Sequence, residues 1–326
     1  MNIYYLGLRE KTVKHTTFFK DKILIKSSIE TNFPCYEKIL GHECDYNLIE
    51  NFVPISNFYD YMIEKVCAID PNALFMPYNQ LTIQHIKNKD KIICVNDLDL
   101  IKTLNNKPKT REIFKGIVSQ LDYIYLEGKD VSFEKINALF KAKSNKYVVQ
   151  EFTGFGGIGT FVLSKESESK ILQKLNKTHF YSISKYVENN IPINNTFIIT
   201  KNKILIFDGT IQNILLENEL LYDGWDSEKY EKLNSNLKVS IYNQTYGIAK
   251  KLQELGYIGI GGVDYIIEND KIYFMEINPR FQTSSEGLDK KLQEQGLPSI
   301  FELQYMSFYD ISQFEYFYNK IKSQGN

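Results

Sequence analysis

The 326-residue chain has few cysteines, no excess of one charge and no long apolar run, and each absence excludes a class of protein. Its four cysteines form no CxxC pair and have no Cys/His spacing that would suit a zinc site, so buried free thiols are expected. The net charge of -1 provides no electrostatic footprint for nucleic acid. No apolar run reaches the roughly 20 residues that a membrane-spanning helix needs. We therefore expect neither a nucleic-acid partner nor a membrane partner.

The composition is that of an ordinary globular protein, with 43% hydrophobic and 24% charged residues. The N-terminal stretch MNIYYLGLREK becomes charged after a short strand-like run, unlike the basic and then apolar order of a signal peptide. We therefore predict a cytoplasmic location. The length fits two or three subdomains that share a cleft.

Hydrophobic patterns predict three units and an α/β fold class with α+β lobes. Residues 1–105 alternate helix-like stretches with short β-type runs, which is typical of an α/β subdomain; the runs are 2–6, 22–25, 73–76 and 91–95. Residues 106–190 predict a small antiparallel lobe of short strands and helices around a glycine cluster. Residues 191–326 contain long β runs at 195–200 and 203–211, an amphipathic helix over about 228–255, a hairpin and a helical end.

The hairpin is expected to carry a polar patch. In GGVDYIIENDKIYFMEINPRF, two β runs flank the turn-forming residues 268–271. Because side chains alternate along a strand, Glu276, Asn278 and Arg280 share one face, and Asp264 lies roughly opposite Glu276. Facing carboxylates repel unless a cation lies between them, and Mg²⁺ prefers such oxygen ligands. The alternative is an exposed hairpin face with ordinary surface charges.

A glycine cluster, GFGGIG, begins at Gly154 and spells the GxGxxG pattern of dinucleotide-binding folds. That pattern requires a helix to open within the motif, whereas Gly159 is followed by the strand-like residues 160–163. The cluster therefore predicts strand, glycine turn and strand. In such a turn the backbone N–H groups of Gly156, Gly157 and Gly159 can lie over phosphate oxygens, although a flexible hairpin tip is the alternative.

The pattern D-x(11)-E-x-N-P-R after a GxGGVDY strand resembles the metal-binding signature of the ATP-grasp superfamily, which includes biotin carboxylase, carbamoyl phosphate synthetase and D-alanine ligase. The resemblance covers roughly residues 105–290. It implies an ATP-grasp fold, in which an N-terminal α/β subdomain precedes a small antiparallel lobe and a C-terminal antiparallel sheet flanked by helices. It further implies that Asp264, Glu276 and Asn278 bind two Mg²⁺ ions and that Arg280 steadies an acyl phosphate or tetrahedral intermediate.

The resemblance also suggests the contacts with ATP. Lys107, at the start of an expected helix, matches a phosphate-binding lysine, although such a lysine taken alone is more often solvated. The backbones of Lys185 and Val187 would pair with adenine, while Tyr186 packs into the core. Many relatives bind ribose through an acid, and Asn194 is the candidate for that role in this chain.

One position departs from the family pattern. Gln150 stands where the family usually has a lysine that contacts phosphate, and glutamine can donate a hydrogen bond but carries no charge. The implied activity is an ADP-forming ligase that joins a small-molecule carboxylate to an amine, with amino acids or peptides as substrates. The alternatives are a nucleotide-binding protein with little turnover and a kinase that uses the same site. The oligomeric state stays open between a monomer and the homodimer common among relatives.

Overall fold

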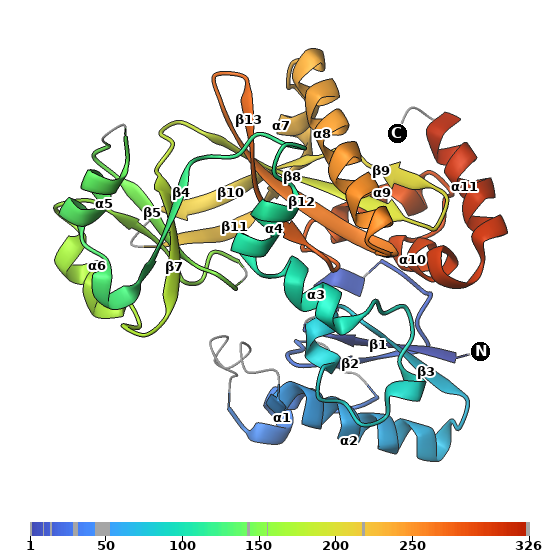
Figure 1. Cartoon of the computed structure of the whole chain (residues 1–326). Coiled ribbons are helices and arrows are strands. Elements are labelled where there is room, and N and C mark those ends of the chain that lie inside the picture. The colour runs from blue at the N-terminus through green and yellow to red at the C-terminus, as the bar shows by residue number, and fades with distance from the viewer. Residues whose placement is uncertain are drawn as a thin grey trace.

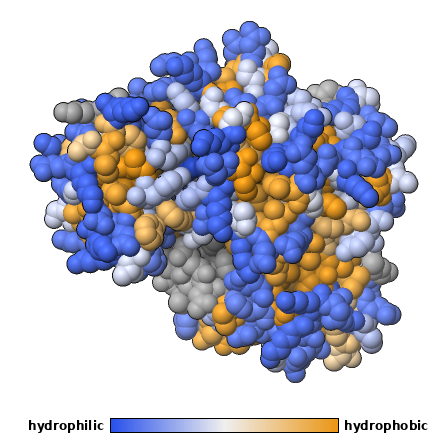
Figure 2. All heavy atoms as spheres, viewed as in Figure 1, coloured by the Kyte–Doolittle hydropathy of each residue, from blue (hydrophilic) through white to orange (hydrophobic). Residues whose placement is uncertain are grey.

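The computed structural model describes residues 2–8, 10–13, 15–28, 32–42, 53–141, 144–154, 156–216 and 219–323. Three sheets follow one another along the chain, and the predicted mixed α/β class is confirmed (Figure 1). Each sheet lies within one of the three expected units. Figure 2 shows that hydrophilic residues cover most of one face of the molecule, with apolar residues in smaller groups between them.

The N-terminal sheet is parallel and has the strand order β2-β1-β3. Its strands are β1 (Asn2–Gly7), β2 (Asp21–Leu24) and β3 (Ala73–Pro77), accompanied by α1 (Tyr36–Leu40), α2 (Val53–Ile69), α3 (Leu98–Leu104) and the 3₁₀ helices η1 (Glu10–Val13), η3 (Gln80–Ile83) and η4 (Lys89–Lys91). The strand expected over 91–95 is wrong. Its place is taken by η4 and a single bridge between Ile92 and Phe75, because Cys94 adopts a left-handed backbone with φ 58° that a regular strand cannot include.

The small lobe is a four-stranded antiparallel sheet with the order β4-β7-β5-β6. Its elements are β4 (Tyr123–Glu127), η5 (Gly128–Asp130), α5 (Phe133–Leu139), β5 (Tyr147–Glu151), β6 (Thr160–Leu163), α6 (Glu168–Lys174) and β7 (Phe180–Lys185). The helix α4 (Lys107–Ile113) precedes this sheet. The predicted strand, glycine turn and strand are confirmed by β5 and β6, which pair in register from Tyr147 to Gln150.

The C-terminal sheet is antiparallel, with the order β11-β10-β8-β12-β13 and β9 paired to β8. Its strands are β8 (Ile191–Ile199), β9 (Ile204–Ile206), β10 (Thr210–Leu216), β11 (Leu220–Asp226), β12 (Gly259–Glu268) and β13 (Lys271–Asn278). The helices of this region are α7 (Ser227–Glu231), α8 (Ser235–Glu254), α9 (Ser285–Glu294), α10 (Ile300–Tyr309) and α11 (Ile311–Ser323).

Two expected elements of this region are divided in the structure. The helix predicted over 228–255 is split into α7 and α8, because the Asn234 side chain accepts the N–H of Asn236 and so caps a new helix. The β run 203–211 is split into β9 and β10. The break lies at Phe207, whose N–H still binds the Thr196 carbonyl of β8 while its own carbonyl accepts from the side chain of Asn195.

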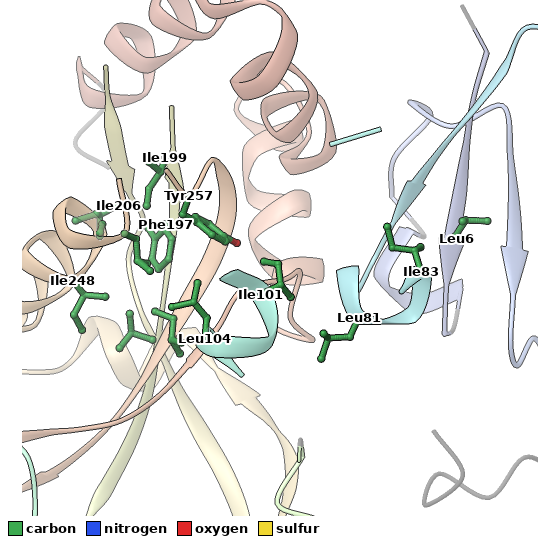
Figure 3. Packing of buried hydrophobic residues seen from close by; sticks show 14 of the residues in the cluster. Leu6, Leu81, Ile83, Ile101, Leu104, Phe197, Ile199, Ile206, Ile248 and Tyr257 are labelled. Atoms are coloured by element: carbon green, nitrogen blue, oxygen red, sulfur yellow. The ribbon is translucent and has the colours of Figure 1, made fainter. Parts of the chain in front are cut away.

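Apolar packing joins the N-terminal subdomain to the C-terminal sheet but leaves the small lobe with a core of its own. Figure 3 shows side chains of one continuous cluster, from Leu6 and Ile83 through Ile101 and Leu104 to Phe197. The small lobe instead packs a separate cluster between its sheet and helices, which includes Val131, Ile136, Val149, Leu163, Ile171, Tyr181 and Ile183. The cleft between the small lobe and the C-terminal sheet therefore lies between separately packed units.

A buried acid in α9 provides a test of the fold's pH dependence. Asp289 is 1% exposed and accepts the N–H of Ile300 and the side-chain amide of Gln293. Burial is the largest influence on this group and raises the pKa of Asp289 from 3.8 to about 6. The folded chain therefore holds this proton more tightly than the unfolded chain, and the associated stability is lost as the pH rises from 3.8 towards about 6.

We expect Asp289→Asn to raise the free energy of unfolding by about 1–3 kcal/mol at pH 8, because the amide removes a buried charge. At pH 4 the gain should disappear, since the wild-type carboxyl is then largely protonated. Urea unfolding at both pH values measures the difference. Gln293→Ala is the control that removes one hydrogen bond without removing the charge, and an equal effect of Asp289→Asn at both pH values would contradict the prediction.

Candidate active site

The hairpin β12–β13 places the predicted polar residues together. Asp264 pairs directly with Glu276 in the register, and the turn residues Asn269 and Asp270 both have positive φ, as a tight hairpin turn requires. The predicted opposition of the two carboxylates is therefore confirmed. Asn278 follows on the same face of β13, and Arg280 lies just beyond the end of the strand.

Asp264 is held by three amide side chains. Its Oδ1 accepts from Asn194 at 2.7 Å and from Gln212 at 3.1 Å, and its Oδ2 accepts from Asn278 at 2.8 Å. Burial, followed by repulsion from Glu276, raises the pKa of Asp264 to about 7, although the amide hydrogen bonds and Arg280 act in the opposite direction. Asp264 and Glu276 thus face each other, and the described side chains that are hydrogen-bonded to Asp264 are all amides.

Glu276 has a cationic partner from the small-lobe side. The Nζ atom of Lys107 lies 3.2 Å from Glu276 Oε2 and 3.5 Å from the carbonyl oxygen of Gly154. Lys107 is 5% exposed, so the interpretation of this residue as a solvated surface lysine is wrong. Because its backbone N–H also binds the Phe152 carbonyl, Lys107 ties the start of α4 to the glycine loop and to the hairpin.

Arg280 is oriented by the chain around it. Its Nη2 donates to Asn278 Oδ1 at 2.8 Å, and its Nη1 donates to the Phe281 carbonyl at 3.1 Å. The amide of Asn278 therefore bridges Asp264 and Arg280. This arrangement holds a planar guanidinium next to Asn278 and near Asp264, where it can bind a phosphoryl or carboxylate oxygen of a ligand.

A cavity of about 670 Å³ contacts most of the predicted site residues. Its lining includes Gln150, Gly156, Gly157, Lys185, Val187, Asn194, Asp264, Glu276, Asn278 and Arg280. Lys107 and Gly159 lie outside the lining, Lys107 because it is packed against Glu276 and Gly154, and Gly159 because it packs against the Glu151 side chain. A volume of this size accommodates a nucleotide-sized molecule.

The glycine loop closes onto the C-terminal sheet. The carbonyl of Gly156 accepts the N–H of Tyr222 at 3.1 Å, and a Cβ atom at Gly157 would lie 1.7 Å from the carbonyl oxygen of Leu220. Gly157 also has a φ of 85°, a conformation that favours glycine. The loop therefore crosses from the small lobe to β11 at a point where no larger residue fits.

The segment after β7 forms another part of the cavity wall. Val187 is 7% exposed, whereas Tyr186 is only half-buried, lines the cavity and has the Lys146 ammonium 5.5 Å from its ring centre. The expectation that Tyr186 packs into the core is wrong, because the strand ends at Lys185 and the alternation of side chains ends with it.

Gln150 faces the cavity from β5. Its Nε2 atom donates to Thr160 Oγ1 at 3.2 Å, so the amide leans towards β6. The residue directly across on the other neighbouring strand, β7, is Ser182. Lys146 lies nearby in the chain, but its ammonium is paired with Glu188 at 2.9 Å. It therefore does not supply the charge of the family lysine whose place Gln150 takes.

Several cavity residues were missed at the level of sequence. Gln212 binds Asp264, and Thr210 and Tyr222 line the same cavity. The feature of the sequence that could have identified them is the alternation of polar residues in a long β run, as at Thr210 and Gln212. Only the pairing of β10 with β8, and of β8 with β12, places these polar residues next to Asn194 and Asp264.

The donor set suits a hard cation. Within the described ranges, no three His, Cys, Asp or Glu side chains gather to hold a metal. The candidate site instead combines the carboxylates of Asp264 and Glu276 with the amide of Asn278, and Mg²⁺ binds carboxylate and amide oxygens while retaining waters and phosphate oxygens. The side chains present therefore fit Mg²⁺.

Known proteins resemble this chain in part of its sequence and in its fold. Residues 129–284 match the model of the ATP-grasp domain family, so this part of the chain carries an ATP-grasp domain. A 72-residue segment, 22% of this chain, is 40% identical to the tyramine–L-glutamate ligase of Methanocaldococcus jannaschii. The match spans 20% of that relative's length.

Solved structures show the same fold at low sequence identity. An N5-carboxyaminoimidazole ribonucleotide synthetase, solved as an ADP complex, has a TM-score of 0.60 at 15% identity, covering 94% of this chain and 76% of its own. The D-alanine–D-alanine ligase of Helicobacter pylori has a TM-score of 0.55 at 13% identity, with coverages of 92% and 99%. An L-amino acid ligase of Bacillus licheniformis has a TM-score of 0.54 at 10% identity, with coverages of 90% and 70%.

In the part of the chain that the structure describes, we find no helix with the length and apolar character to cross a membrane.

Proposed function

We propose that this protein is an ATP-dependent, ADP-forming ligase that activates a carboxylate and joins it to an amine. The observation that carries the proposal is the single cavity that brings the glycine loop, the segment after β7 and the acidic hairpin together. The names of the similar proteins support the same chemistry, since they include two amino acid ligases and a ligase that joins tyramine to L-glutamate.

We assign a role in ATP or Mg²⁺ binding to each group of residues predicted from the sequence. The backbones of Lys185 and Val187 would bind adenine, and the N–H groups of the glycine loop would cover the phosphates. Asn194 is hydrogen-bonded to Asp264 and to Ser284, so we propose that it orients the acidic site instead of binding ribose. Asp264, Glu276 and Asn278 would hold two Mg²⁺ ions, which neutralise phosphate charge when bound.

The proposed chemistry has two transfers. A carboxylate oxygen of the substrate attacks the γ-phosphorus of ATP, the bond to the β-phosphate oxygen breaks, and an acyl phosphate and ADP result. The amine nitrogen then attacks the carbonyl carbon, inorganic phosphate leaves, and the nitrogen loses a proton to give the amide. Arg280 would face the negative charge that develops in both steps. Positioning of the reactants and neutralisation of charge provide most of the rate in such transfers.

The substrate is proposed to lie beyond the acidic hairpin. Gln282, Thr283 and Ser284 line the cavity next to Arg280, and a smaller cavity of about 100 Å³ shares Ser284 with it. Amino acids or peptides are the proposed carboxylates and amines. We further propose a cytoplasmic location, where ATP is available, and three functional units with boundaries near residues 105 and 190.

An ADP-release screen over amino acids, amines and short peptides, with mass spectrometry of the product, tests the proposal. The expected result is ADP formation that requires both a carboxylate and an amine, together with a product lighter by one water than the sum of the two substrates. Tight ATP binding without ADP release for any pair would contradict the ligase function.

The uncharged Gln150, at a position where the family usually has a lysine, supports a second candidate function: a nucleotide-binding protein with little or no turnover. For a working ligase we expect Gln150→Lys to change the rate of ADP release by less than about tenfold, since other groups at the site already act on the phosphates. A far larger gain of activity would favour a degraded site. Gln150→Met is the matched control that removes the hydrogen bond to Thr160 without adding charge.

A further inference from the structure

Arg111 is a buried cation without an acidic partner among the described residues. It is 4% exposed, and no carboxylate of the described ranges lies within ion-pair distance of its guanidinium. Its Nη1 donates to Ser182 Oγ, its planar group lies 3.5 Å from the centre of the Tyr123 ring, and its Nε has no hydrogen-bond partner. Burying an unpaired charge is costly, so such a residue indicates a missing anion.

The position of Arg111 relates it to Gln150. Ser182, which accepts its hydrogen bond, pairs with Gln150 across β5 and β7, and residues directly opposite in antiparallel strands share one face of the sheet. Gln150 lines the nucleotide-sized cavity and leans the other way, towards Thr160. Arg111 and Ser182 lie outside the lining of the cavity, and Arg111 thus places its positive charge behind the lining, one strand away from the neutral Gln150.

Arg111 also differs from the other buried cation of its helix. Lys107 and Arg111 are four residues apart in α4 and so lie on the same face of the helix. The charge of Lys107 is already balanced by Glu276, whereas that of Arg111 is not balanced by any described acid. Of these two cations, Arg111 is therefore the one whose field is not already neutralised by a described acid.

We propose that Arg111 is a positioning residue that supplies the positive charge which Gln150 does not, and so stabilises the phosphates of a nucleotide bound in the cavity. This inference rests on the proposed function, because it requires a nucleotide there. The hydrogen bond to Ser182 fixes the guanidinium behind the sheet face that carries Gln150, and the electric field of its charge acts on the bound phosphates. That field is stronger than the field of a solvated lysine, since the surroundings are less polar than water.

The test compares Arg111→Met with Lys109→Met, which removes the same charge from an exposed position of the same helix. We expect Arg111→Met to weaken ATP binding by about 10- to 100-fold in calorimetry and to leave adenosine binding, followed by NMR, unchanged, whereas Lys109→Met changes neither. Thermal unfolding reports whether each variant is folded. Equal losses for ATP and adenosine, or no loss for ATP, would overturn the inference.

A rescue experiment separates the charge from packing. Adding Gln150→Lys to Arg111→Met should restore ATP affinity to within about fivefold of wild type, because the lysine returns a cation to the same sheet face. Adding Gln150→Met should not restore it. If Gln150→Lys fails to rescue a folded Arg111→Met protein, Arg111 is structural and the inference is wrong.

The outcomes also distinguish this inference from the proposed function. If the wild-type chain binds ATP but releases no ADP with any substrate pair, the proposed ligase function is wrong, while the proposed role of Arg111 in ATP binding still stands. A wild-type chain that does not bind ATP removes the nucleotide site, and this inference with it.

Discussion

Glu276→Gln should lower the rate of substrate-dependent ADP release by about 100- to 1,000-fold, because it removes a carboxylate that would hold the Mg²⁺ ions that neutralise the reacting phosphates. Glu276 is the residue that faces Asp264 across the hairpin and also pairs with Lys107. The neutral amide keeps the shape of the side chain but weakens its interaction with a divalent cation and with the lysine. Steady-state ADP release at saturating ATP and Mg²⁺ measures the effect.

The matched control is Asp270→Asn at the turn of the same hairpin. Asp270 is exposed and has a φ of 63°, which asparagine also adopts readily, so neither the fold nor the site should change. The free energy of unfolding should stay within about 1 kcal/mol of wild type for Asp270→Asn, and thermal unfolding reports whether Glu276→Gln is folded. Unchanged ADP release in a folded Glu276→Gln protein would show that the acidic hairpin is not the catalytic metal site.

Gly157→Ala should weaken ATP binding by at least about tenfold. The added Cβ would meet the Leu220 carbonyl oxygen at 1.7 Å, so the glycine loop must move away from β11 or β11 must shift. Either movement breaks the contact through which the loop covers the cavity, including the hydrogen bond from Tyr222 to Gly156. Calorimetric titration with ATP measures the loss.

Gly156→Ala separates this steric effect from backbone strain. Gly156 has a φ of 68°, similar to the 85° of Gly157, but nothing lies within 4 Å of the position of its Cβ. Both alanines carry the left-handed strain of about 1–2 kcal/mol, whereas only the one at position 157 collides with β11. Equal ATP affinities in the two variants would mean that the contact of the loop with β11 does not matter for binding.

Local patterns were sufficient for the parts of the site that lie within one hairpin. The alternation of β13 and the turn-forming residues 268–271 predict that Glu276 faces Asp264, and the register confirms it. The β-branched and aromatic residues after Gly159 predict a strand instead of a helix, and β6 confirms that prediction as well. In both cases the decisive interactions join residues that are close in the chain.

Contacts between distant segments could not be predicted in this way. The Asn234 cap that divides one long expected helix competes with a continuous apolar pattern. The burial of Lys107 depends on Glu276, 169 residues further along the chain. Gln212 reaches Asp264 only because β10 pairs with β8 and β8 pairs with β12.

The sequence by itself predicted the acidic hairpin and carried the resemblance to the ATP-grasp superfamily, because both depend on residues within a short segment. The tertiary structure alone decided which cations accompany the site. Lys107 is neutralised by Glu276, while Arg111 is buried without an acid beside the strand pair that carries Gln150. Charge balance is a property of the assembled fold, since it depends on groups that separate elements bring within a few ångströms of one another.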